Sequence, residues 1–276
     1  MTIYVTGYDG NVGRALVKRG FHPLECDVTE FLDVQRVIRK QKPNLLVHLA
    51  AETNVNWCEE PANKEKALRT NFHGASFITQ VCDDNKVPFI LLSTDHIFSG
   101  SRWGRYKEMD IKHESPLNWY GYTKFGAEIF ATTSKYGHVV RTSVLFNWEA
   151  HGLKDYVERL DNGLYIEVPT FITRSFMYVE HFANALIHYI ARMDKAPQII
   201  HISGSKTISW YDFMSQFATV FGYDQRLIVP RRKEVQGVYS PRNFKGGLNI
   251  GIAKRLRIPC PSYIDGLRQM KKDGKP

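Results

Sequence analysis

Short apolar runs alternate with amphipathic helical segments through the first half of the chain, and this alternation restricts the fold more than any other feature. Residues 45–49, Leu-Leu-Val-His-Leu, are apolar at almost every position, as in a strand of a parallel sheet covered on both faces. Residues 31–38, 62–84 and 120–135 show the spacing of helices. The alternation predicts right-handed βαβ units, and hence an α/β fold with a doubly wound parallel (Rossmann) sheet.

Composition excludes several classes of protein. The 276 residues are 43% apolar and 24% charged, so the chain is expected to be globular. No apolar run approaches a membrane span, and the N-terminus lacks the pattern of a signal peptide. The net charge of +9 is spread along the chain, which favours phosphates on a small ligand over nucleic acid. The four cysteines form no C-x-x-C pair and predict reduced thiols. We therefore expect a cytoplasmic protein without a metal site.

A glycine motif follows the first apolar run. Gly7, Gly10 and Gly13 form G-x-x-G-x-x-G between the predicted strand at 3–5 and a helix from Asn11. The first two glycines permit a tight turn that brings backbone N–H groups to a pyrophosphate, and the third lets the helix pack closely. The motif predicts a dinucleotide site, against the alternative of a turn that binds nothing.

The second strand of this site is shortened. The next strand is predicted at Leu24-Glu25-Cys26, with Thr29 capping the following helix, and Asp27 stands 20 residues after Gly7. The usual residue that selects NAD or NADP is then missing. Arg14, Lys18, Arg19 and His22 are candidates for a 2′-phosphate contact, or are solvated helix charges. The choice between NAD and NADP stays open.

After about residue 146 the alternation is less regular. A helix near 179–193 and a strand at 199–202 still have the pattern of sheet elements, Ser209 is expected to cap a helix, and residues 223–262 are rich in Pro, Gly and Arg. We predict a dinucleotide-binding domain at 1–146, to which 178–204 return, and a smaller substrate lobe formed mainly by 147–276.

Three side chains suggest carbonyl chemistry. Tyr120 and Lys124 form Y-x-x-x-K, which places them one helical turn apart. A reduced carbonyl needs a proton on oxygen, and an ammonium neighbour is expected to lower the pKa of a phenol from about 10. The Thr94 hydroxyl, at the end of a predicted buried strand, can hydrogen-bond the same oxygen. The alternative is a surface pair on an ordinary helix.

Together these segments resemble the extended short-chain dehydrogenase/reductases, and among them the dTDP-4-dehydrorhamnose reductases, over nearly the full length. The matching segments are 10–16 (GNVGRAL), 27–29 (DVT), 50–55 (AAETNV), 93–95 (STD) with Phe98 and Gly100, 120–128, 141–143, 209–213, 242–243 with 248–249, and 261–268.

The resemblance implies an NAD(P)H-dependent reductase of a nucleotide-linked 4-keto-6-deoxy sugar. Tyr120 would donate the proton, Lys124 would support it and contact the cofactor ribose, and Thr94 would polarise the 4-keto group. The cofactor, NADP or NAD, would be lined by Gly7, Gly10, Asn11, Val12, Gly13, Asp27, Val28, Ala50, Ala51, Thr53, Asn71, Ser93, Tyr120 and Lys124. Asn71 would aid a proton relay or simply cap backbone.

Several positions depart from the family pattern. His96 replaces a Tyr, residues 54–57 (Asn-Val-Asn-Trp) lack an acid and a lysine, and Val144 replaces a Trp. Residues 173–183 resemble a segment of sugar epimerases and dehydratases in which an arginine meets the ligand diphosphate. Candidates for the substrate side are Thr94, Asp95, His96, Arg174 and Arg242, the two arginines being equally compatible with structural ion pairs.

Two other functions remain open. One is a nucleotide-sugar epimerase or 4,6-dehydratase that retains its nicotinamide, although dehydration in such relatives uses an Asp-Glu pair and Asp95 is followed here by His96. The other is a non-catalytic regulatory subunit with a dinucleotide fold, similar to that of methionine adenosyltransferase. A homodimer is also left open.

Overall fold

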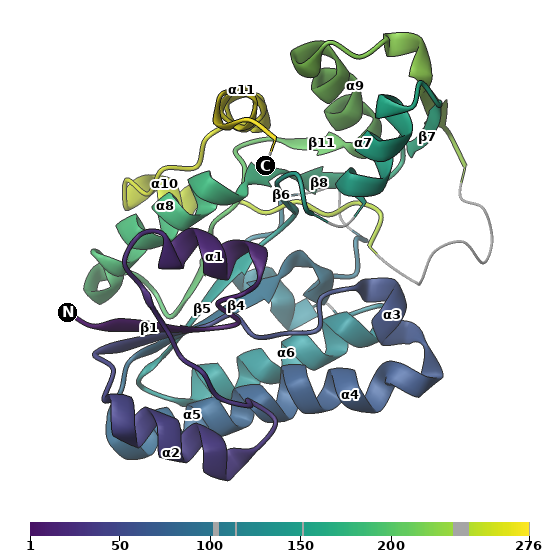
Figure 1. Ribbon diagram of the computed structural model, residues 1–276. Coiled ribbons are helices and arrows are strands. Elements are labelled where there is room, and N and C mark those ends of the chain that lie inside the picture. The colour runs from purple at the N-terminus through teal and green to yellow at the C-terminus, as the bar shows by residue number, and fades with distance from the viewer. Residues whose placement is uncertain (102–104, 114, 151, 234–242, 276) are drawn as a thin grey trace.

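A six-stranded parallel sheet forms the centre of the computed structural model, which describes residues 1–276 except 102–104, 114, 151, 234–242 and 276 (Figure 1). Its strands lie in the order β10-β5-β4-β3-β1-β2, and every neighbouring pair is parallel. The bounds are β1 Ile3–Thr6, β2 His22–Pro23, β3 Leu45–His48, β4 Phe89–Thr94, β5 Gly137–Thr142 and β10 Ile199–His201. The chain moves outward from β1 in both directions, which confirms the predicted doubly wound sheet.

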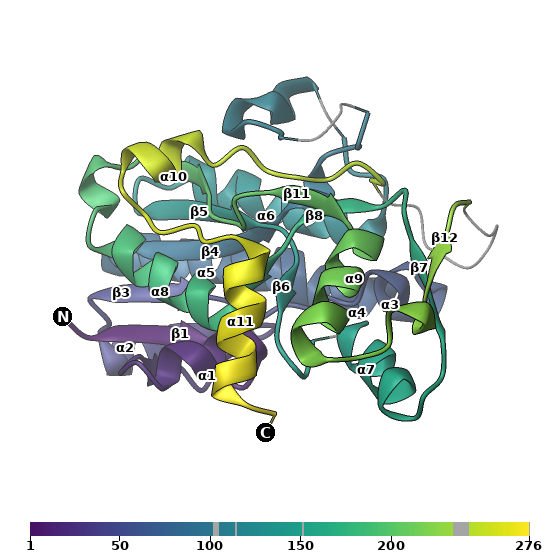
Figure 2. The ribbon, with the colours of Figure 1, turned by 90° about the horizontal axis from the view of Figure 1, so that it is seen from above.

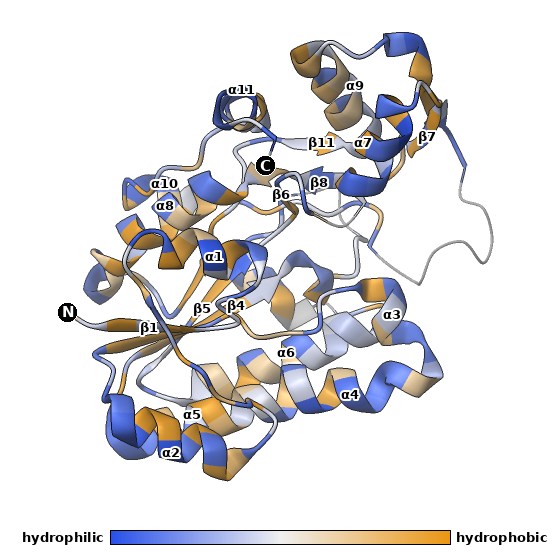
Figure 3. Cartoon of the chain, viewed as in Figure 1, coloured by the Kyte–Doolittle hydropathy of each residue, from blue (hydrophilic) through white to orange (hydrophobic). Residues whose placement is uncertain are grey.

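Helices cover both faces of this sheet. On one face lie α1 (Asn11–Val17), α8 (Val179–Ile190) and α10 (Gly251–Arg255), and on the other lie α2 (Phe31–Gln41), α5 (Gly74–Asn85) and α6 (Trp119–Thr133) (Figure 1). Successive strand residues serve opposite cores, since Val47 packs with the first group and Leu46 with the second. In Figure 3 the strands of the sheet are largely orange, whereas α2 carries both orange and blue residues, as a helix with one buried face should.

The helical segment expected at 62–84 is present but not uniform. It runs through α4 (Lys64–Leu68), a π-helical turn (Arg69–His73) and α5. The short helix α3 (Val55–Glu59) precedes it, followed by a 3-10 turn at Pro61–Asn63. The wider turn places Asn71 inside the protein, where it is 1% exposed.

The second half builds a separate core beside the sheet (Figure 2). Its central residues include Phe146, Phe176, Phe213 and Phe217. It contains three two-stranded sheets that pair β6 with β9, β7 with β12, and β8 with β11. The elements are β6 Leu145–Phe146, α7 Leu153–Asp161, β7 Ile166–Pro169, β8 Thr173–Ser175, β9 Met177–Tyr178, β11 Thr207–Ser209, α9 Trp210–Phe221, β12 Ile228–Arg231 and α11 Tyr263–Asp273. Further 3-10 turns span Asp95–Ile97, Glu108–His113, Met193–Lys195 and Gln225–Leu227.

Two local predictions need correction, and one is confirmed. Strand β2 lies at His22–Pro23, not at 24–26. Leu24 still donates its N–H to the oxygen of Val5 at 2.9 Å, and the chain then leaves the sheet. Thr29 does not cap α2, because its hydroxyl donates to Asp27 Oδ1 at 2.7 Å and Glu30 occupies the N-cap. Ser209 does cap α9, in a capping box with Asp212.

Within the described part of the chain, no helix combines the length and the apolar character that a bilayer crossing requires.

Candidate active site

The glycine turn between β1 and α1 is packed too tightly to admit side chains. Gly7 has a φ of +62°, and a Cβ there would stand 2.7 Å from the nitrogen of Ala50. A Cβ on Gly13 would stand 2.2 Å from the oxygen of Gly7. The turn closes with the N–H of Gly10 donating to the oxygen of Gly7 at 3.2 Å. Only glycine fits at these two crowded positions, so no side chain covers the backbone of the turn where β1 ends.

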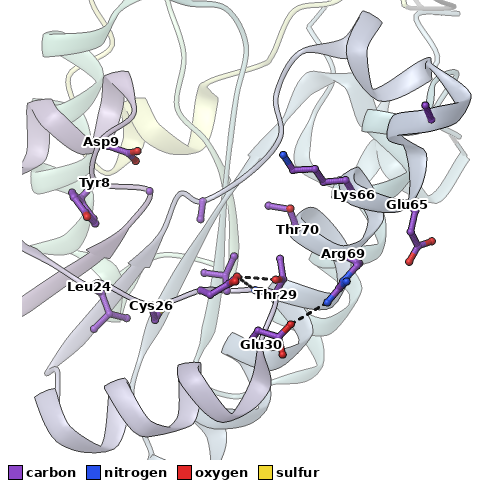
Figure 4. Close-up of a pocket in the computed structure, with 15 residues that line it drawn as sticks. Tyr8, Asp9, Leu24, Cys26, Thr29, Glu30, Glu65, Lys66, Arg69 and Thr70 are labelled. Carbon is purple, nitrogen blue, oxygen red and sulfur yellow. Dashed lines mark hydrogen bonds and ion pairs between the residues drawn. The ribbon is translucent and has the colours of Figure 1, made fainter.

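A pocket of about 850 Å³ opens beside this turn (Figure 4). One wall follows the loop after β2, and the opposite wall is the helical segment from 62 to 70. The lining residues are Gly7, Tyr8, Asp9, Leu24, Cys26, Asp27, Val28, Thr29, Glu30, Ala50, Ala62, Glu65, Lys66, Arg69 and Thr70. It lies where the strand order reverses around β1, the usual ligand crevice of an open α/β sheet.

Four of the residues predicted to line the cofactor lie in this pocket: Gly7, Asp27, Val28 and Ala50. Gly10, Asn11, Val12 and Gly13 form the adjoining turn and the start of α1. Ala51 and Thr53 lie on the segment between β3 and α3, where Thr53 is exposed.

Asn71 and Ser93, also predicted to contact the cofactor, bond within the protein. The Asn71 amide accepts from the N–H of Glu52 at 2.8 Å and donates to the oxygen of Glu52 and to Thr123 Oγ1, both at 3.0 Å. Asn71 thus ties the segment after β3 to helix α6. The Ser93 hydroxyl donates to the carboxylate of Glu128. Their roles toward a cofactor stay predictions.

The three predicted catalytic side chains are all buried, at the carboxyl edge of the sheet. Thr94 ends β4, while Tyr120 and Lys124 lie one turn apart on α6, and all three are 8% exposed or less. Thr94 lies near enough to the phenol of Tyr120 to lower its pKa, although burial outweighs this effect. Strands β1, β3 and β4 are neighbours, so the end of β4 lies roughly 10 Å from the glycine turn. A dinucleotide that starts in the pocket can therefore reach these side chains.

The electrostatics of the site differ in one respect from expectation. Burial raises the pKa of Tyr120 above its usual range, with smaller increases from Cys58 and Asp95, and only the hydrogen bond with Thr94 lowers it. The predicted lowering of this pKa by Lys124 is therefore wrong. Burial lowers the pKa of Lys124 itself to about 8, against the opposing effect of Glu128. Desolvation is therefore the largest effect on the pKa of both Tyr120 and Lys124.

His48 contributes to the same environment. It ends β3, and its Nδ1 lies 2.8 Å from Thr6 Oγ1. Burial, helped by the charge of Lys124, lowers the pKa of His48 to about 3. The imidazole is therefore neutral and adds no positive charge beside Lys124.

The structure pairs two of the predicted substrate residues with each other. Arg174 Nε lies 3.6 Å from Asp95 Oδ2, and both side chains are 3% exposed. Asp95 also accepts from the Ser143 hydroxyl at 2.6 Å, and Arg174 donates to Asn243 Oδ1 at 2.7 Å. The sequence allows two roles for Arg174, a contact with the ligand diphosphate or a structural ion pair, and the structure contains the ion pair. Arg242 lies outside the described residues.

His96 lies directly beside Tyr120. Its ring meets that of Tyr120 edge to face, with centroids 5.7 Å apart, and its backbone N–H donates to Thr94 Oγ1 at 3.2 Å. Because Thr94 Oγ1 accepts this bond, its own hydrogen can point toward the Tyr120 phenol or a bound carbonyl.

Several side chains at the site were not predicted. Lys66, Arg69 and Thr70 line the pocket from the helical segment, where Arg69 pairs with Glu30 at 3.1 Å and Lys66 with Glu52 at 3.5 Å. Their sequence pattern is that of a solvated helix face, and only the packing of that helix across from the β2 loop brings them to the pocket. Asn118 was not predicted either. It is the N-cap of α6, the helix that carries Tyr120 and Lys124, and an Asn before a helical segment is a recognisable cap.

Comparison with known proteins agrees with this geometry. Residues 1–274 match the family model described as "RmlD substrate binding domain". A dTDP-4-dehydrorhamnose reductase of Aggregatibacter actinomycetemcomitans is 28% identical over 227 residues, 76% of each chain. A dTDP-4-keto-6-deoxy-D-glucose reductase of Streptomyces niveus is 34% identical over 160 residues, 54% of each chain. The solved structure of a Bacillus anthracis dTDP-4-dehydrorhamnose reductase in complex with NADP superposes with a TM-score of 0.89 at 22% identity, covering 99% of this chain and all of that one. The chain therefore belongs to the RmlD substrate binding domain family.

Proposed function

We propose that this protein reduces the 4-keto group of a nucleotide-linked 4-keto-6-deoxy sugar, using NADPH or NADH. The observation that carries the proposal is the burial of Thr94, Tyr120 and Lys124 together, the last two one helical turn apart on α6, at the sheet edge that also holds the glycine turn. The relatives named above, which are reductases of dTDP-linked 4-keto sugars, support the same class of reaction.

The residues present suit a dinucleotide. Only glycine fits at positions 7 and 13, so no side chain covers the backbone of the turn there, and the adjoining pocket of about 850 Å³ offers room for the adenosine half. The proposed contacts are Gly7, Gly10, Asn11, Val12, Gly13, Asp27, Val28, Ala50, Ala51, Thr53, Asn71 and Ser93, with Tyr120 and Lys124 toward the ribose. When bound, a reduced nicotinamide supplies a hydride to a carbonyl carbon.

Proton delivery falls to this chain's own side chains. The Tyr120 hydroxyl gives its proton to the C4 oxygen of the substrate as that oxygen gains charge. The Thr94 hydroxyl donates a hydrogen bond to the same oxygen, its lone pair being held by the N–H of His96. The ammonium of Lys124 stabilises the phenolate that remains. Because burial raises the pKa of Tyr120, the phenol is protonated near neutral pH, as a proton donor must be.

The substrate side is proposed to lie between the end of β4 and the second core. Thr94 and His96 stand at its edge beside Tyr120, and Asp95 and Arg174 shape it through their buried ion pair. Arg174 and Arg242 remain candidates for the diphosphate. We also propose the division into a cofactor domain (1–146 with 178–204) and a substrate lobe (mainly 147–276), supported by the pairing of β10 with β5 and by the separate core of the second half.

Two further expectations belong to this proposal. All four cysteines are unpaired thiols, which supports a cytoplasmic setting. We also propose a homodimer, for which the apolar side chains of Tyr122 and Ile129 on α6, 52% and 50% exposed, are candidate contacts. Light scattering of the purified protein tests the assembly, and a monomer at micromolar concentration would contradict it.

The proposed activity is tested with purified protein, a dTDP-4-keto-6-deoxyhexose, and NADPH or NADH, by following the absorbance of the reduced cofactor. We expect steady oxidation that falls about 10²- to 10⁴-fold in Tyr120→Phe. Conversion of the sugar without net loss of cofactor would instead indicate an epimerase. Absence of turnover with either cofactor would favour a regulatory subunit.

A further inference from the structure

A pair of opposite charges joins the two walls of the pocket beside the glycine turn. Glu30, the N-cap of α2, stands on the wall formed by the loop after β2, and Arg69 stands where α4 passes into the π-helical turn. Arg69 Nη2 lies 3.1 Å from Glu30 Oε1, and Figure 4 shows the two side chains meeting between the walls. The side chain of Arg69 is 51% exposed and that of Glu30 is 61% exposed, so a ligand in solution can reach both.

A second cation stands on the wall of Arg69. Lys66 precedes Arg69 by three residues, so both side chains leave the helical segment on the same side and line the pocket. In Figure 4 Lys66 extends into the pocket, while the neighbouring Glu65 is directed to the other side of the helix. Lys66 Nζ lies 3.5 Å from Glu52 Oε1 and 5.5 Å from the ring centroid of Trp57. The helical wall therefore presents two positive charges to a ligand in the pocket.

The acid that could bind a ribose hydroxyl is engaged within its own loop. In NAD sites a carboxylate after the second strand accepts from the 2′-hydroxyl of the adenosine ribose. Here Asp27 Oδ1 accepts from the N–H of Thr29 at 2.9 Å and from the Thr29 hydroxyl at 2.7 Å. The N–H of Asp27 in turn donates to Asp33 Oδ2 at 2.8 Å. A ribose with an unmodified 2′-hydroxyl therefore meets a carboxylate of which one oxygen is already occupied.

The pair of Glu30 and Arg69 is of a kind that a stronger anion displaces. Exposed ion pairs contribute little to stability, because water and salt screen them. A phosphate monoester carries almost two negative charges at neutral pH and three acceptor oxygens, so it competes with a single carboxylate for a guanidinium. It can also bind the guanidinium through two parallel hydrogen bonds. The displaced Glu30 side chain is already largely in water, so its release costs little.

We propose that Arg69, assisted by Lys66, selects NADPH over NADH by binding the 2′-phosphate of the adenosine ribose in exchange for Glu30. This inference rests on the proposed function only in placing the adenosine half of the cofactor in this pocket. Glu30 is the counter-ion that the phosphate replaces, so it limits the preference for NADPH. Selection between the two cofactors thereby falls to the wall opposite the shortened second strand.

Two fragments of the cofactor test the proposal without turnover. Calorimetry compares adenosine 2′,5′-bisphosphate with 5′-AMP, which differ only in the 2′-phosphate, at an ionic strength of about 0.15 M. We expect the wild type to bind the bisphosphate at least about tenfold more tightly than 5′-AMP. Arg69→Gln should remove most of this difference and leave the Kd for 5′-AMP within about twofold. Lys66→Gln should weaken the bisphosphate by a smaller factor. Glu30→Gln should tighten it, because a competing carboxylate is removed.

A matched variant controls for the loss of one positive charge. Arg39 is exposed near the end of α2 and does not line this pocket, so Arg39→Gln should leave the ratio of the two Kd values unchanged. With the complete cofactors, the ratio of kcat/KM for NADPH to that for NADH should fall in Arg69→Gln and rise in Glu30→Gln.

Equal Kd values for the two fragments in the wild type would overturn this inference. So would an Arg69→Gln variant that binds both fragments equally more weakly, since Arg69 would then contact the adenosine and not the 2′-phosphate. If neither fragment binds, the dinucleotide site is wrong and the proposed function fails together with this inference. If the bisphosphate binds as expected but no sugar is reduced, the proposed function fails and this inference stands.

Discussion

Arg141 and Glu128 form an ion pair inside the protein, with Arg141 Nη2 2.7 Å from Glu128 Oε2 and neither side chain more than 3% exposed. Arg141 Nε also donates to both carboxylate oxygens, and the hydroxyl of Ser93 donates to the same group. These residues belong to β5, α6 and β4 respectively, so the carboxylate joins the helix that carries Tyr120 to the strand that ends at Thr94.

Removing one partner of this pair should be costly. Glu128→Gln removes the carboxylate that the buried Arg141 guanidinium contacts directly, and we expect the free energy of unfolding to fall by about 3–5 kcal/mol. Urea denaturation gives the value. The matched control is Glu128→Gln with Arg141→Met, which removes both charges and should recover part of the loss. A decrease below about 1 kcal/mol in the single variant would contradict a buried pair.

The glycine turn predicts a graded response to alanine. Gly13→Ala sets a Cβ 2.2 Å from the Gly7 oxygen. Because that oxygen belongs to the backbone of the turn, it cannot move away at low cost, and cofactor binding should weaken by at least tenfold. Gly10→Ala is the comparison within the same turn, because its Cβ would stand 3.3 Å from that oxygen at a φ of −73°. Fluorescence titration with NADPH measures both. Equal losses in the two variants would argue against the packing described.

The lowered pKa of Lys124 predicts a pH dependence. Because burial brings this pKa from 10.5 to about 8, the ammonium is charged below that pH and neutral above it. We therefore expect kcat/KM for NADPH, which reports groups of the free enzyme, to fall as pH rises through about 8. Lys124→Arg keeps its charge, so its profile should stay flat to pH 10 whatever its absolute rate. A wild-type profile that is flat to pH 10 would contradict the assignment.

Variants of Asp95 and Arg174 distinguish a structural role of Arg174 from a role in binding the ligand diphosphate. Asp95→Asn, Arg174→Gln and the double variant form a cycle, and we expect a coupling energy of about 1–3 kcal/mol in urea denaturation. If Arg174 also meets the diphosphate, Arg174→Gln should raise the KM for the nucleotide sugar more than Asp95→Asn does. Equal KM values in the two single variants would leave Arg174 with the ion pair alone.

The sequence predicted those parts of the molecule that depend on local pattern. The alternation of apolar runs and helices determined the parallel sheet, and the spacing of Gly7, Gly10 and Gly13 located the turn that the structure packs against Ala50. The four-residue spacing of Tyr120 and Lys124 placed both on one buried face of α6. In each case the relevant period is short, so the residues that matter are near one another in the chain.

The rest depends on contacts between distant segments. Strand β2 begins two residues earlier and ends three residues earlier than the apolar pattern at 24–26 indicates, because its position is set by pairing with β1, where Val5 lies opposite Pro23. The ion pair between Asp95 and Arg174 joins residues 79 positions apart, and no spacing rule foretells it. The raised pKa of Tyr120 has a similar origin, because motif spacing shows the lysine one turn away but not how completely the phenol is desolvated.

Isotope transfer shows whether the hydride of the reduced cofactor reaches C4 of the sugar and whether this transfer requires Tyr120 as the proton donor. The wild type is incubated with a dTDP-4-keto-6-deoxyhexose and NADPH carrying deuterium at the transferable C4 position, and the product is examined by NMR and mass spectrometry. We expect one deuterium at C4 of the sugar, formed with the wild type and nearly absent with Tyr120→Phe, although that variant still binds NADPH. Deuterium at any other sugar carbon, or equal product from Tyr120→Phe, would contradict the account.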